Sequence, residues 1–541
     1  MAPVQDTTAP QSQLACIHCR QSKRRCDKLY PECRLCLQKH LRCEYPVRRK
    51  QREQQIEDEH SFSSLSPLQA QSITAPPSTT SSRSQLSRTS LPWLATTPAT
   101  SDAQDGGAFN VNDSGLASFL FLDPRLFHKM RLQVPKIHTT VRASVVELVG
   151  DLDDIKGIST LYFDTIHAWM PIVSKKQFFE NLPNRLTQRR SELFLLVLAM
   201  KLCCARITTP RTDLYHAVKQ FYFDMENSGA LSIQVLQAAI LIAIYEVGHA
   251  IYPAAILSVG SCARYASCLG IDTTARPPKS MQLPWIEVEE CCRIWWSIAI
   301  LDRFLNLCDP RRHPATPDPH AGTYLPVDDA SWDAGTSAPE DALTIGSSSA
   351  ARLARYGRFA QAAYHLTQVL NLATETHNVT MQLRRTIMAL VELAESEGHW
   401  KRWGFCTQMA ICYSAILMLE KPWLPTSEDG MFAGLDDTNP TPVSNEAAVA
   451  LQAAFDMISY FFIENNGWTC YRTSPFISHF LYLAASMHSR YSHLNLRGPV
   501  DKLGALKQSL RLVNDRWLAA GVYLSLLEGQ EILSVAEQGV L

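Results

Sequence analysis

The sequence contains no apolar run long enough to cross a lipid bilayer. The best candidate, Ala238 to Tyr245, is about eight residues long and ends at Glu246, whereas a membrane-spanning helix needs roughly 20 residues. The first residues, Met1 to Leu14, include neither a basic segment nor an apolar one, so we expect no secretory leader. We therefore expect no membrane partner, and we expect the 16 cysteines to carry reduced thiols rather than disulfides.

Common catalytic motifs are also missing. The sequence has no glycine-rich phosphate loop, no H-E-x-x-H pattern and no G-x-S-x-G pattern. Asp302 and Arg303 follow two tryptophans without a nucleophile and a base nearby, so we interpret them as core residues that satisfy helix ends. The adjacent pairs Cys203–Cys204 and Cys291–Cys292 are unsuited to chelating one zinc ion, and we interpret them as small core hydrophobes. We do not expect an enzyme.

The net charge of the chain is also close to zero. Its 51 basic residues are balanced by 52 acidic ones, which gives a formal net charge of -1. The balance is uneven along the chain. From Cys16 to Arg52 about 12 basic and 3 acidic residues leave roughly +9, so the rest of the chain carries roughly -10. A short, strongly basic segment of this kind predicts a partner with many negative charges, such as a nucleic acid.

Six cysteines fall within this basic segment and form a pattern that repeats about 17 residues later. They are Cys16, Cys19, Cys26, Cys33, Cys36 and Cys43, spaced C-x2-C-x6-C-x6-C-x2-C-x6-C. Structural zinc takes four ligands in a tetrahedron, so one ion would leave two cysteines unused. Two ions need about eight ligand positions, which six sulfurs supply if two thiolates each bridge both metals. We therefore predict two Zn²⁺ per chain, and the spacing alone leaves open which two cysteines bridge.

Other interpretations of the same cysteines remain open at this point. The two C-x2-C pairs alone have the C-x2-C-x13-C-x2-C spacing of a one-zinc finger, which would leave Cys26 and Cys43 without a metal. A disulfide module is a further alternative. His18 lies between two predicted ligands, but the six sulfurs already complete both sites, so we expect an exposed loop residue there.

The segment closely resembles the fungal zinc binuclear cluster DNA-binding domain. Besides the cysteines, the residues that carry the likeness are Arg20, Lys23, Arg25, Asp27 and Pro31. The resemblance implies that the first and fourth cysteines, Cys16 and Cys33, bridge the two zinc ions, and that a short helix after the second cysteine enters the major groove. It also implies that Lys23 reads the guanines of a CGG triplet, which agrees with the donors that lysine offers to guanine O6 and N7.

The distribution of basic residues predicts which face of the cluster meets double-stranded DNA. The cations of the first half are Arg20, Lys23, Arg24 and Arg25. The matching stretch of the second half contains only Lys39 and Arg42. We therefore expect the first half to face DNA, with base edges read there and further cations on phosphates. A basic run after the last cysteine includes Arg48, Arg49 and Lys50. It could contact phosphates along the DNA backbone, act as a nuclear localisation patch or form a solvated flank.

Two regions bear on flexibility and on dimers. From Ser61 to Ser101 about 24 of 41 residues are Ser, Thr or Pro. This stretch is too polar to bury a core, so we expect a disordered tether.

Many family members pair through a coiled coil after the cluster, but Arg48 to His60 offers only Ile56 as an apolar seam residue, so a dimer is not supported there. A seam near the C-terminus could pair two chains or pack within its own bundle. Its members are Leu503, Leu506, Leu510, Val513, Trp517, Ala520, Leu524 and Leu527.

From about residue 116 onward, apolar residues recur at three- and four-residue steps, which predicts an all-α bundle or helical array. The segment from Val235 to Val247 is apolar nearly all round, so we expect it at the centre. Several stretches resemble the fungal-specific transcription factor regulatory domain, also called the middle homology region. They are Leu161–Phe163, Pro171–Ile172, Phe178, Gly260, Ala263–Arg264, Leu269–Gly270, Arg293–Trp296, Asp302–Arg303 and Tyr324–Pro326. The family's usual Gly-Arg-Pro is replaced by Arg312-His313-Pro314.

We predict four parts: a disordered N-terminus over 1–15, a zinc cluster DNA-binding domain over 16–52, a disordered linker over 53–115, and an all-α regulatory domain over 116–541 whose family-like core covers about 150–329. The expected function is a nuclear, sequence-specific RNA polymerase II transcription factor that recognises CGG-like triplets and activates a metabolic or secondary-metabolite gene cluster. Coactivators are expected partners, and the acidic and apolar segment 428–437 resembles activation segments but could be a solvated loop. The alternative is a metabolite sensor or enzyme in the helical part, with DNA binding only as targeting.

Overall fold

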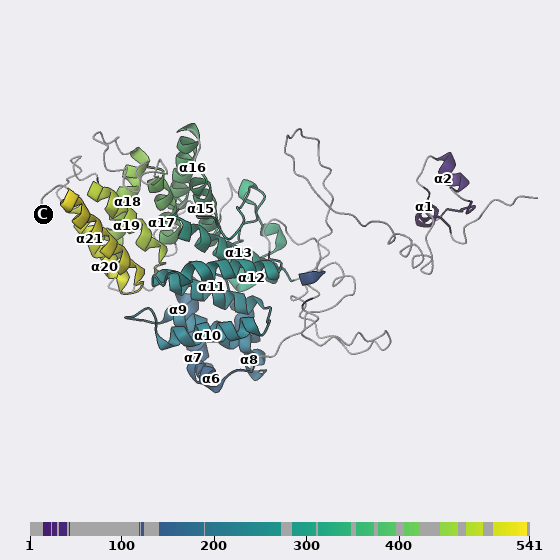
Figure 1. Ribbon diagram of the computed structural model, residues 1–541, viewed down its shortest axis with the longest axis horizontal. Coiled ribbons are helices and arrows are strands. Elements are labelled where there is room, and N and C mark those ends of the chain that lie inside the picture. Colours follow the sequence, from purple (N-terminus) through teal and green to yellow (C-terminus); the bar gives the residue numbers. More distant parts are fainter. Residues whose placement is uncertain are drawn as a thin grey trace, which may run out of the picture. The chain divides into compact units, whose positions relative to one another are not determined.

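The computed structural model falls into two units, Met1–Gln85 and Leu86–Leu541 (Figure 1). It describes residues 15–22, 24–29, 32–39, 43, 118, 121–123, 140–188, 190–271, 284–309, 312–347, 353–372, 377–396, 405–420, 444–463, 472–490 and 501–537. Within these residues, regular structure is helical apart from one isolated bridge between Tyr324 and Thr344. The predicted fold class, a small cysteine domain and a large all-α region, is confirmed. The linker predicted over 53–115 and the acidic segment 428–437 lie outside the described residues.

The small unit contains two helices of five residues each, α1 (Ile17–Gln21) and α2 (Arg34–Gln38). Isolated helices this short are not stable in water, because a single turn does not offset the cost of helix nucleation. Among the residues of this unit that the structure describes, the fully buried ones are four cysteines. The two helices must therefore be held by what the cysteines bind.

The large unit begins with a group of helices that surrounds α11. The group consists of α6 (Ala143–Val149), α7 (Leu152–Asp164), α8 (Lys175–Thr187), α9 (Ser191–Cys204), α10 (Asp213–Asn227), α11 (Ile233–Gly248) and α12 (Ala254–Cys268). Every residue of α11 from Val235 to Gly248 is buried, and the helix packs against α9, α10 and α12. Ser232 begins the helix, since its hydroxyl accepts a hydrogen bond from the Gln234 N–H at 3.2 Å. The prediction that this apolar segment lies at the centre is confirmed.

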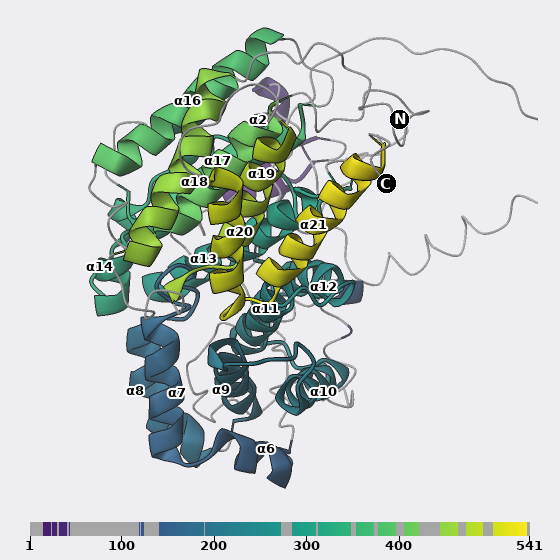
Figure 2. The ribbon, with the colours of Figure 1, turned by 90° about the vertical axis from the view of Figure 1, so that its left-hand side faces the viewer.

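A second group of helices follows α13, which joins the two groups because it packs against α11, α12 and α15. The elements are α13 (Trp285–Asn306), α14 (Asp329–Ala334), the 3₁₀ helices Pro339–Asp341 and Ile345–Ser347, α15 (Arg355–Leu370), α16 (His377–Ser396), α17 (Phe405–Met418), α18 (Asn445–Ile463), α19 (Phe476–Arg490), α20 (Lys502–Asn514) and α21 (Ala519–Glu537). Figure 2 shows α17 to α21 side by side, with α21 packed against α19 and α20. One apolar core runs through both groups, from Val145 to Leu527.

The turn between α20 and α21 anchors the C-terminal helices to α11. Trp517 is fully buried against Gly248, where a Cβ atom would collide with its ring, and its Nε1–H donates to the Thr473 carbonyl at 2.7 Å. The Leu518 N–H donates to His249 Nδ1 at 3.4 Å. Burial, helped by the nearby Arg516, lowers the pKa of His249 to about 3, so its ring stays neutral and can accept this bond.

The C-terminal seam predicted from the sequence packs within its own bundle. It is divided between two helices, because α20 ends at Asn514 and α21 begins at Ala519. Its fully or nearly fully buried members are Leu506, Leu510, Val513, Trp517, Ala520 and Leu527. Leu503 and Leu524 are partly buried and pack against the same core. Of the two uses that the sequence left open, the structure shows the one inside the chain.

Candidate metal centre and nucleic-acid interface

The structure brings the six N-terminal cysteines together as two overlapping groups of four. One group is Cys16, Cys19, Cys26 and Cys33, and the other is Cys16, Cys33, Cys36 and Cys43. Within each group the sulfur atoms all lie within 4.8 Å of one another. Cys16 and Cys33 belong to both groups, so the arrangement has two four-sulfur sites with a shared edge.

The same local structure builds the two halves of this cluster. Cys16 caps α1, where its sulfur accepts from the Cys19 N–H at 3.5 Å, and Cys33 caps α2, where its sulfur accepts from the Cys36 N–H at 3.4 Å. Each C-x2-C pair therefore places one sulfur before a helix and the next within its first turn. The repeat in the sequence becomes a repeat of two capped helices, and the two capping cysteines are those that both groups share.

The distances between sulfur atoms fit thiolates around zinc. Cys16 and Cys33 have their sulfurs 3.8 Å apart, and the Cys19 and Cys33 sulfurs are 3.7 Å apart. Four sulfurs placed tetrahedrally at about 2.3 Å from a zinc ion would lie about 3.8 Å from each other, whereas a disulfide requires about 2.05 Å. All six of these cysteines are free of disulfides. The donor set is thus soft, reduced and spaced for tetrahedral coordination.

The thiols also have the electrostatic character of sites that exchange protons for a metal. Burial raises the pKa of Cys16, Cys19 and Cys36 above the ordinary thiol value, so these three thiols hold their protons at neutral pH when no cation is near. At Cys33 the hydrogen bonds, first that from the Cys36 N–H, outweigh burial and lower the pKa to about 7. A divalent cation stabilises the thiolates and releases the protons, which couples metal binding to folding of this segment.

Of the cations predicted to contact DNA, the structure describes three. Arg20 lies in α1, Arg24 and Arg25 follow it, and all three side chains are exposed. Lys23, Arg48, Arg49 and Lys50 lie outside the described residues. In the second half, the exposed residues of and just after α2 include Arg34, Lys39 and Leu37, which is 59% exposed. The described part of the cluster thus presents three clustered arginines on its first half, and two cations with an apolar side chain between them on its second.

Two nearby side chains differ from what the sequence suggested. His18 was expected in a loop, but it lies within α1, is half-buried, and has Nε2 3.4 Å from the Ser22 hydroxyl. Asp27 has a role that the spacing did not reveal: its carboxylate accepts from the Arg34 N–H at 3.2 Å. Because this bond connects the loop of the first half to the start of α2, Asp27 helps to hold the two halves together. Its position directly after a cysteine was the one available signal.

The Asp302–Arg303 pair in the helical unit is buried, as the sequence interpretation expected, but it anchors a loop rather than a helix end. Arg303 is 1% exposed and donates to the carbonyls of Thr316 and Pro317 at 3.1 and 3.0 Å and to the Asp318 carboxylate at 2.8 Å. Asp302 accepts from the Thr316 N–H at 2.8 Å. The loop after α13 thus engages both carboxylate oxygens of Asp302 and one side of the Arg303 guanidinium, whose Nε–H donates to the Thr367 hydroxyl of α15 at 3.3 Å.

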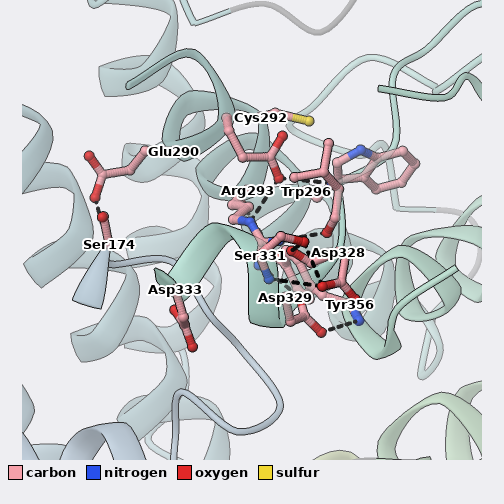
Figure 3. A network of polar contacts seen from close by, with 12 residues as sticks. Ser174, Glu290, Cys292, Arg293, Trp296, Asp328, Asp329, Ser331, Asp333 and Tyr356 are labelled. Atoms are coloured by element: carbon pink, nitrogen blue, oxygen red, sulfur yellow. Dashed lines mark hydrogen bonds and ion pairs between the residues drawn. The ribbon is translucent and has the colours of Figure 1, made fainter. Parts of the chain in front are cut away.

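Arg293 anchors the next part of the same loop from the middle of α13 (Figure 3). It is fully buried and donates to Glu289 and Asp329 at 2.8 Å and to the Val327 carbonyl at 2.7 Å. Its guanidinium carbon lies 4.1 Å from the ring centre of Trp332. Burial alone would lower the pKa of Arg293, but Asp329 and Glu289 raise it, so the side chain stays charged. In the sequence, this arginine stands out only as part of a stretch that resembles the family.

The paired cysteines of the helical unit do not join a metal group among the described residues. Cys203 is fully buried and its thiol donates to the Leu241 carbonyl at 2.9 Å. Cys292 is half-buried and its thiol lies 3.7 Å from the Tyr324 carbonyl oxygen. The described helices also include none that is long and apolar enough to cross a membrane.

Two family models match the chain. Residues 14–52 match the fungal Zn(2)-Cys(6) binuclear cluster domain, and residues 160–387 match the fungal specific transcription factor domain. The transcription factor BOA15 of Botryotinia fuckeliana is 37% identical over 148 residues, which is 27% of this chain and 83% of that protein.

Two longer matches are with regulators of biosynthesis in Monascus ruber. The pigment biosynthesis transcriptional activator pigB is 26% identical over 319 residues, 54% of this chain and 52% of that protein. The citrinin biosynthesis transcriptional activator mrl3 is 24% identical over 347 residues, 59% of this chain and 64% of that protein. The chain thus spans about half to two thirds of the length of these two activators.

Proposed function

The chain belongs to the fungal transcription factors that carry a Zn(2)-Cys(6) binuclear cluster, and from this premise we propose that it holds two zinc ions and reads CGG-like triplets in duplex DNA. As a member it is a zinc-binding, DNA-binding regulator rather than an enzyme. The observation that carries the proposal is the overlap of two four-sulfur groups in one basic segment. Zinc, when bound, supplies the positive charge that keeps all six sulfurs as thiolates.

Each cysteine has a defined part in this proposal. Cys19 and Cys26 hold the first zinc ion, Cys36 and Cys43 hold the second, and Cys16 and Cys33 are shared by both. The shared pair is supported by its membership of both sulfur groups and by the 3.8 Å separation of its two sulfurs. With six thiolates and two zinc ions the cluster carries roughly -2, so the segment remains basic at roughly +7.

The proposed DNA-reading residues lie in α1 and in the sequence just after it. Lys23, just beyond this helix, donates to guanine O6 and N7, and Arg20, Arg24 and Arg25 contact the neighbouring backbone or base edges. Arg48, Arg49 and Lys50 contact phosphates on the flank. The support for this division is the exposure of three closely spaced arginines, Arg20, Arg24 and Arg25, on the first half. The described second half exposes fewer cations, Arg34 and Lys39, with the apolar Leu37 between them in the sequence.

The wider role that we propose is activation of a secondary-metabolite gene cluster in the nucleus. Its support is the similarity to activators named for pigment and citrinin biosynthesis. In this proposal residues 16–52 bind DNA, the linker over 53–115 tethers them, and residues 116–541 form the regulatory domain that recruits coactivators. The basic run from Arg48 to Lys50 also serves nuclear import.

Selection of bound sites from random duplex DNA by the zinc-loaded, full-length protein tests this function. The expected result is enrichment of one or two CGG-like triplets, together with two zinc ions per chain by elemental analysis. Lys23→Ala should lose the triplet preference, whereas Lys39→Ala, a matched lysine on the second half, should keep it. Enrichment of an unrelated motif, or no enrichment above unselected DNA, would contradict the proposed recognition.

A further inference from the structure

The four residues Arg24–Asp27, which we call the basic loop, are held at both ends by hydrogen bonds. At the start of the loop, the Arg24 N–H donates to the Cys19 carbonyl in α1 at 2.9 Å. At its end, the Asp27 carboxylate accepts from the Arg34 N–H, and both carboxylate oxygens lie 3.2 Å from that nitrogen. The basic loop is therefore fixed to the helix of its own half and to the helix of the other half.

The backbone just after the basic loop also indicates that this end is held in place. Lys28 has a φ of 61°, in the left-handed region that a residue with a Cβ atom rarely adopts. Such a conformation persists where the contacts around it hold the chain, and the bond of Asp27 to α2 is one of these contacts. The direction in which the chain leaves Cys26 is thus set by the start of α2 as well as by the metal that Cys26 is predicted to bind.

Asp27 differs in charge from the residues before it. Its side chain is exposed and follows the exposed Arg24 and Arg25 closely in the sequence. A carboxylate at this position weakens the attraction of the basic loop to phosphates, so it does not serve non-specific DNA binding. What it provides is a partner for the first N–H of α2, one of the backbone donors that a helix leaves without a partner of its own.

We propose that Asp27 is a positioning residue for the recognition of DNA sequence. It holds the basic loop in the orientation in which the loop's arginines, and Lys23 directly before them, meet base edges. This role rests on the proposed function, in which the first half reads bases. Contacts to base edges require placement to within about 1 Å, whereas contacts to phosphates carry no sequence information. Loss of the link to α2 should therefore reduce discrimination between sequences more than it reduces binding.

Four variants separate the position of the carboxylate from its charge. Asp27→Ala removes both the link and the charge. Asp27→Asn removes the charge but keeps an oxygen that can accept from the Arg34 N–H, and Asp27→Glu keeps the charge but moves the carboxylate by one methylene group. Glu32→Ala is the matched control, since Glu32 is an exposed acidic residue of the same basic segment. All variants are compared as zinc-loaded, full-length protein.

Fluorescence anisotropy compares the site that the natural chain selects from random DNA with a scrambled sequence. The ratio of the two affinities should fall about 10-fold in Asp27→Ala and about 3-fold in Asp27→Glu, but less than about 2-fold in Asp27→Asn and Glu32→Ala. Binding to scrambled DNA should strengthen about 2-fold in the three variants that lose a negative charge. It should stay unchanged in Asp27→Glu, which keeps the charge.

Two further measurements distinguish positioning from a general loss of the fold. Elemental analysis should find the same zinc content in all variants and the natural chain, because each retains the six sulfurs. Hydrogen exchange of the Arg34 amide, followed by mass spectrometry with residue-level fragmentation, should be about 10-fold faster in Asp27→Ala than in the natural chain or Asp27→Asn. If Asp27→Ala loses zinc, the Asp27→Glu and Asp27→Asn variants decide the question with the expectations given above.

Several results would overturn the positioning role. They are an unchanged affinity ratio in Asp27→Ala, and an equal fall in Asp27→Ala and Glu32→Ala, which would make charge the cause. A new preferred base in a site selected by Asp27→Ala would make Asp27 a base reader instead. A natural chain that selects a site unlike CGG would reject the triplet recognition proposed above, but the variants would still be compared on the selected site. A natural chain that selects no site would reject both.

Discussion

The cysteine unit and the helical unit are stabilised in opposite ways. In the described part of the first, the fully buried residues are four cysteines around two five-residue helices, whereas the second has one apolar core from Val145 to Leu527. A segment without an apolar core depends on its metal for folding, and a large apolar core does not. One chain can therefore combine a metal-dependent unit with a unit stabilised by apolar packing, and each responds to a different perturbation.

Of the changes considered, removal of the metal should produce the largest difference in folding between the two units. A strong chelator should unfold the cysteine unit, because zinc contributes about 10–16 kcal/mol to domains of this kind, and should abolish DNA binding. The far-UV circular dichroism of the full chain should change little, since α1 and α2 contribute five residues each. Cooperative loss of most of the helical signal on chelation would show that the helical unit also requires metal.

Cysteine substitutions in the small unit test which sulfurs hold each zinc ion. Cys16→Ala should lose both zinc ions, because Cys16 belongs to both sulfur groups, and Cys26→Ala should lose at least one, because Cys26 belongs to one. Elemental analysis and native mass spectrometry measure the ratio. Cys268→Ala, at an exposed cysteine of α12, is the control and should retain the full complement. Retention of two ions by Cys26→Ala would contradict the ligand assignment.

In the helical unit the large effects should come from the buried charge network. Arg293→Met leaves Glu289 and Asp329 without their buried cation and should lower the free energy of unfolding by about 3–5 kcal/mol. Arg511→Met is the control, because Arg511 and Glu528 are both 51% exposed at 3.9 Å, and should cost less than about 1 kcal/mol. Thermal and urea unfolding measure both. Neither variant should change the zinc content of the protein. A change would show that the stability of the helical unit affects metal binding by the cysteine unit.

The smallest effects should appear in DNA binding by the cysteine unit. Lys23→Ala should cost about 1–3 kcal/mol on the matched triplet and little on scrambled DNA. Arg49→Ala should weaken all sequences alike and reduce the slope of log affinity against log salt by about one. Fluorescence anisotropy titrations at several salt concentrations measure both quantities. Equal losses on matched and scrambled DNA for Lys23→Ala would remove it as a base reader.

Much of the cysteine unit could be predicted from the sequence because its ligands are close along the chain. The helical character of the large unit and the central position of α11 were also predictable, since an apolar pattern with helical steps acts locally. The C-terminal seam shows where this ends. Leu510 of α20 and Leu526 of α21 lie in similar apolar patterns, yet Leu510 is fully buried and Leu526 is 50% exposed. The packing of α19, α20 and α21 against one another decides which face of each helix is covered.

Six cysteines in a basic segment predict a metal site before any fold is known, because a C-x2-C pair sets the positions of both sulfurs through one helical turn. The spacing left open which two cysteines are shared, and the family resemblance implied Cys16 and Cys33. The folded structure brings these two cysteines into both sulfur groups, since this depends on how the two halves meet. It also decided that Arg293 and Arg303 anchor the loop after α13. Such contacts join residues far apart in the chain, and their partners are set by the packing of whole helices rather than by local spacing.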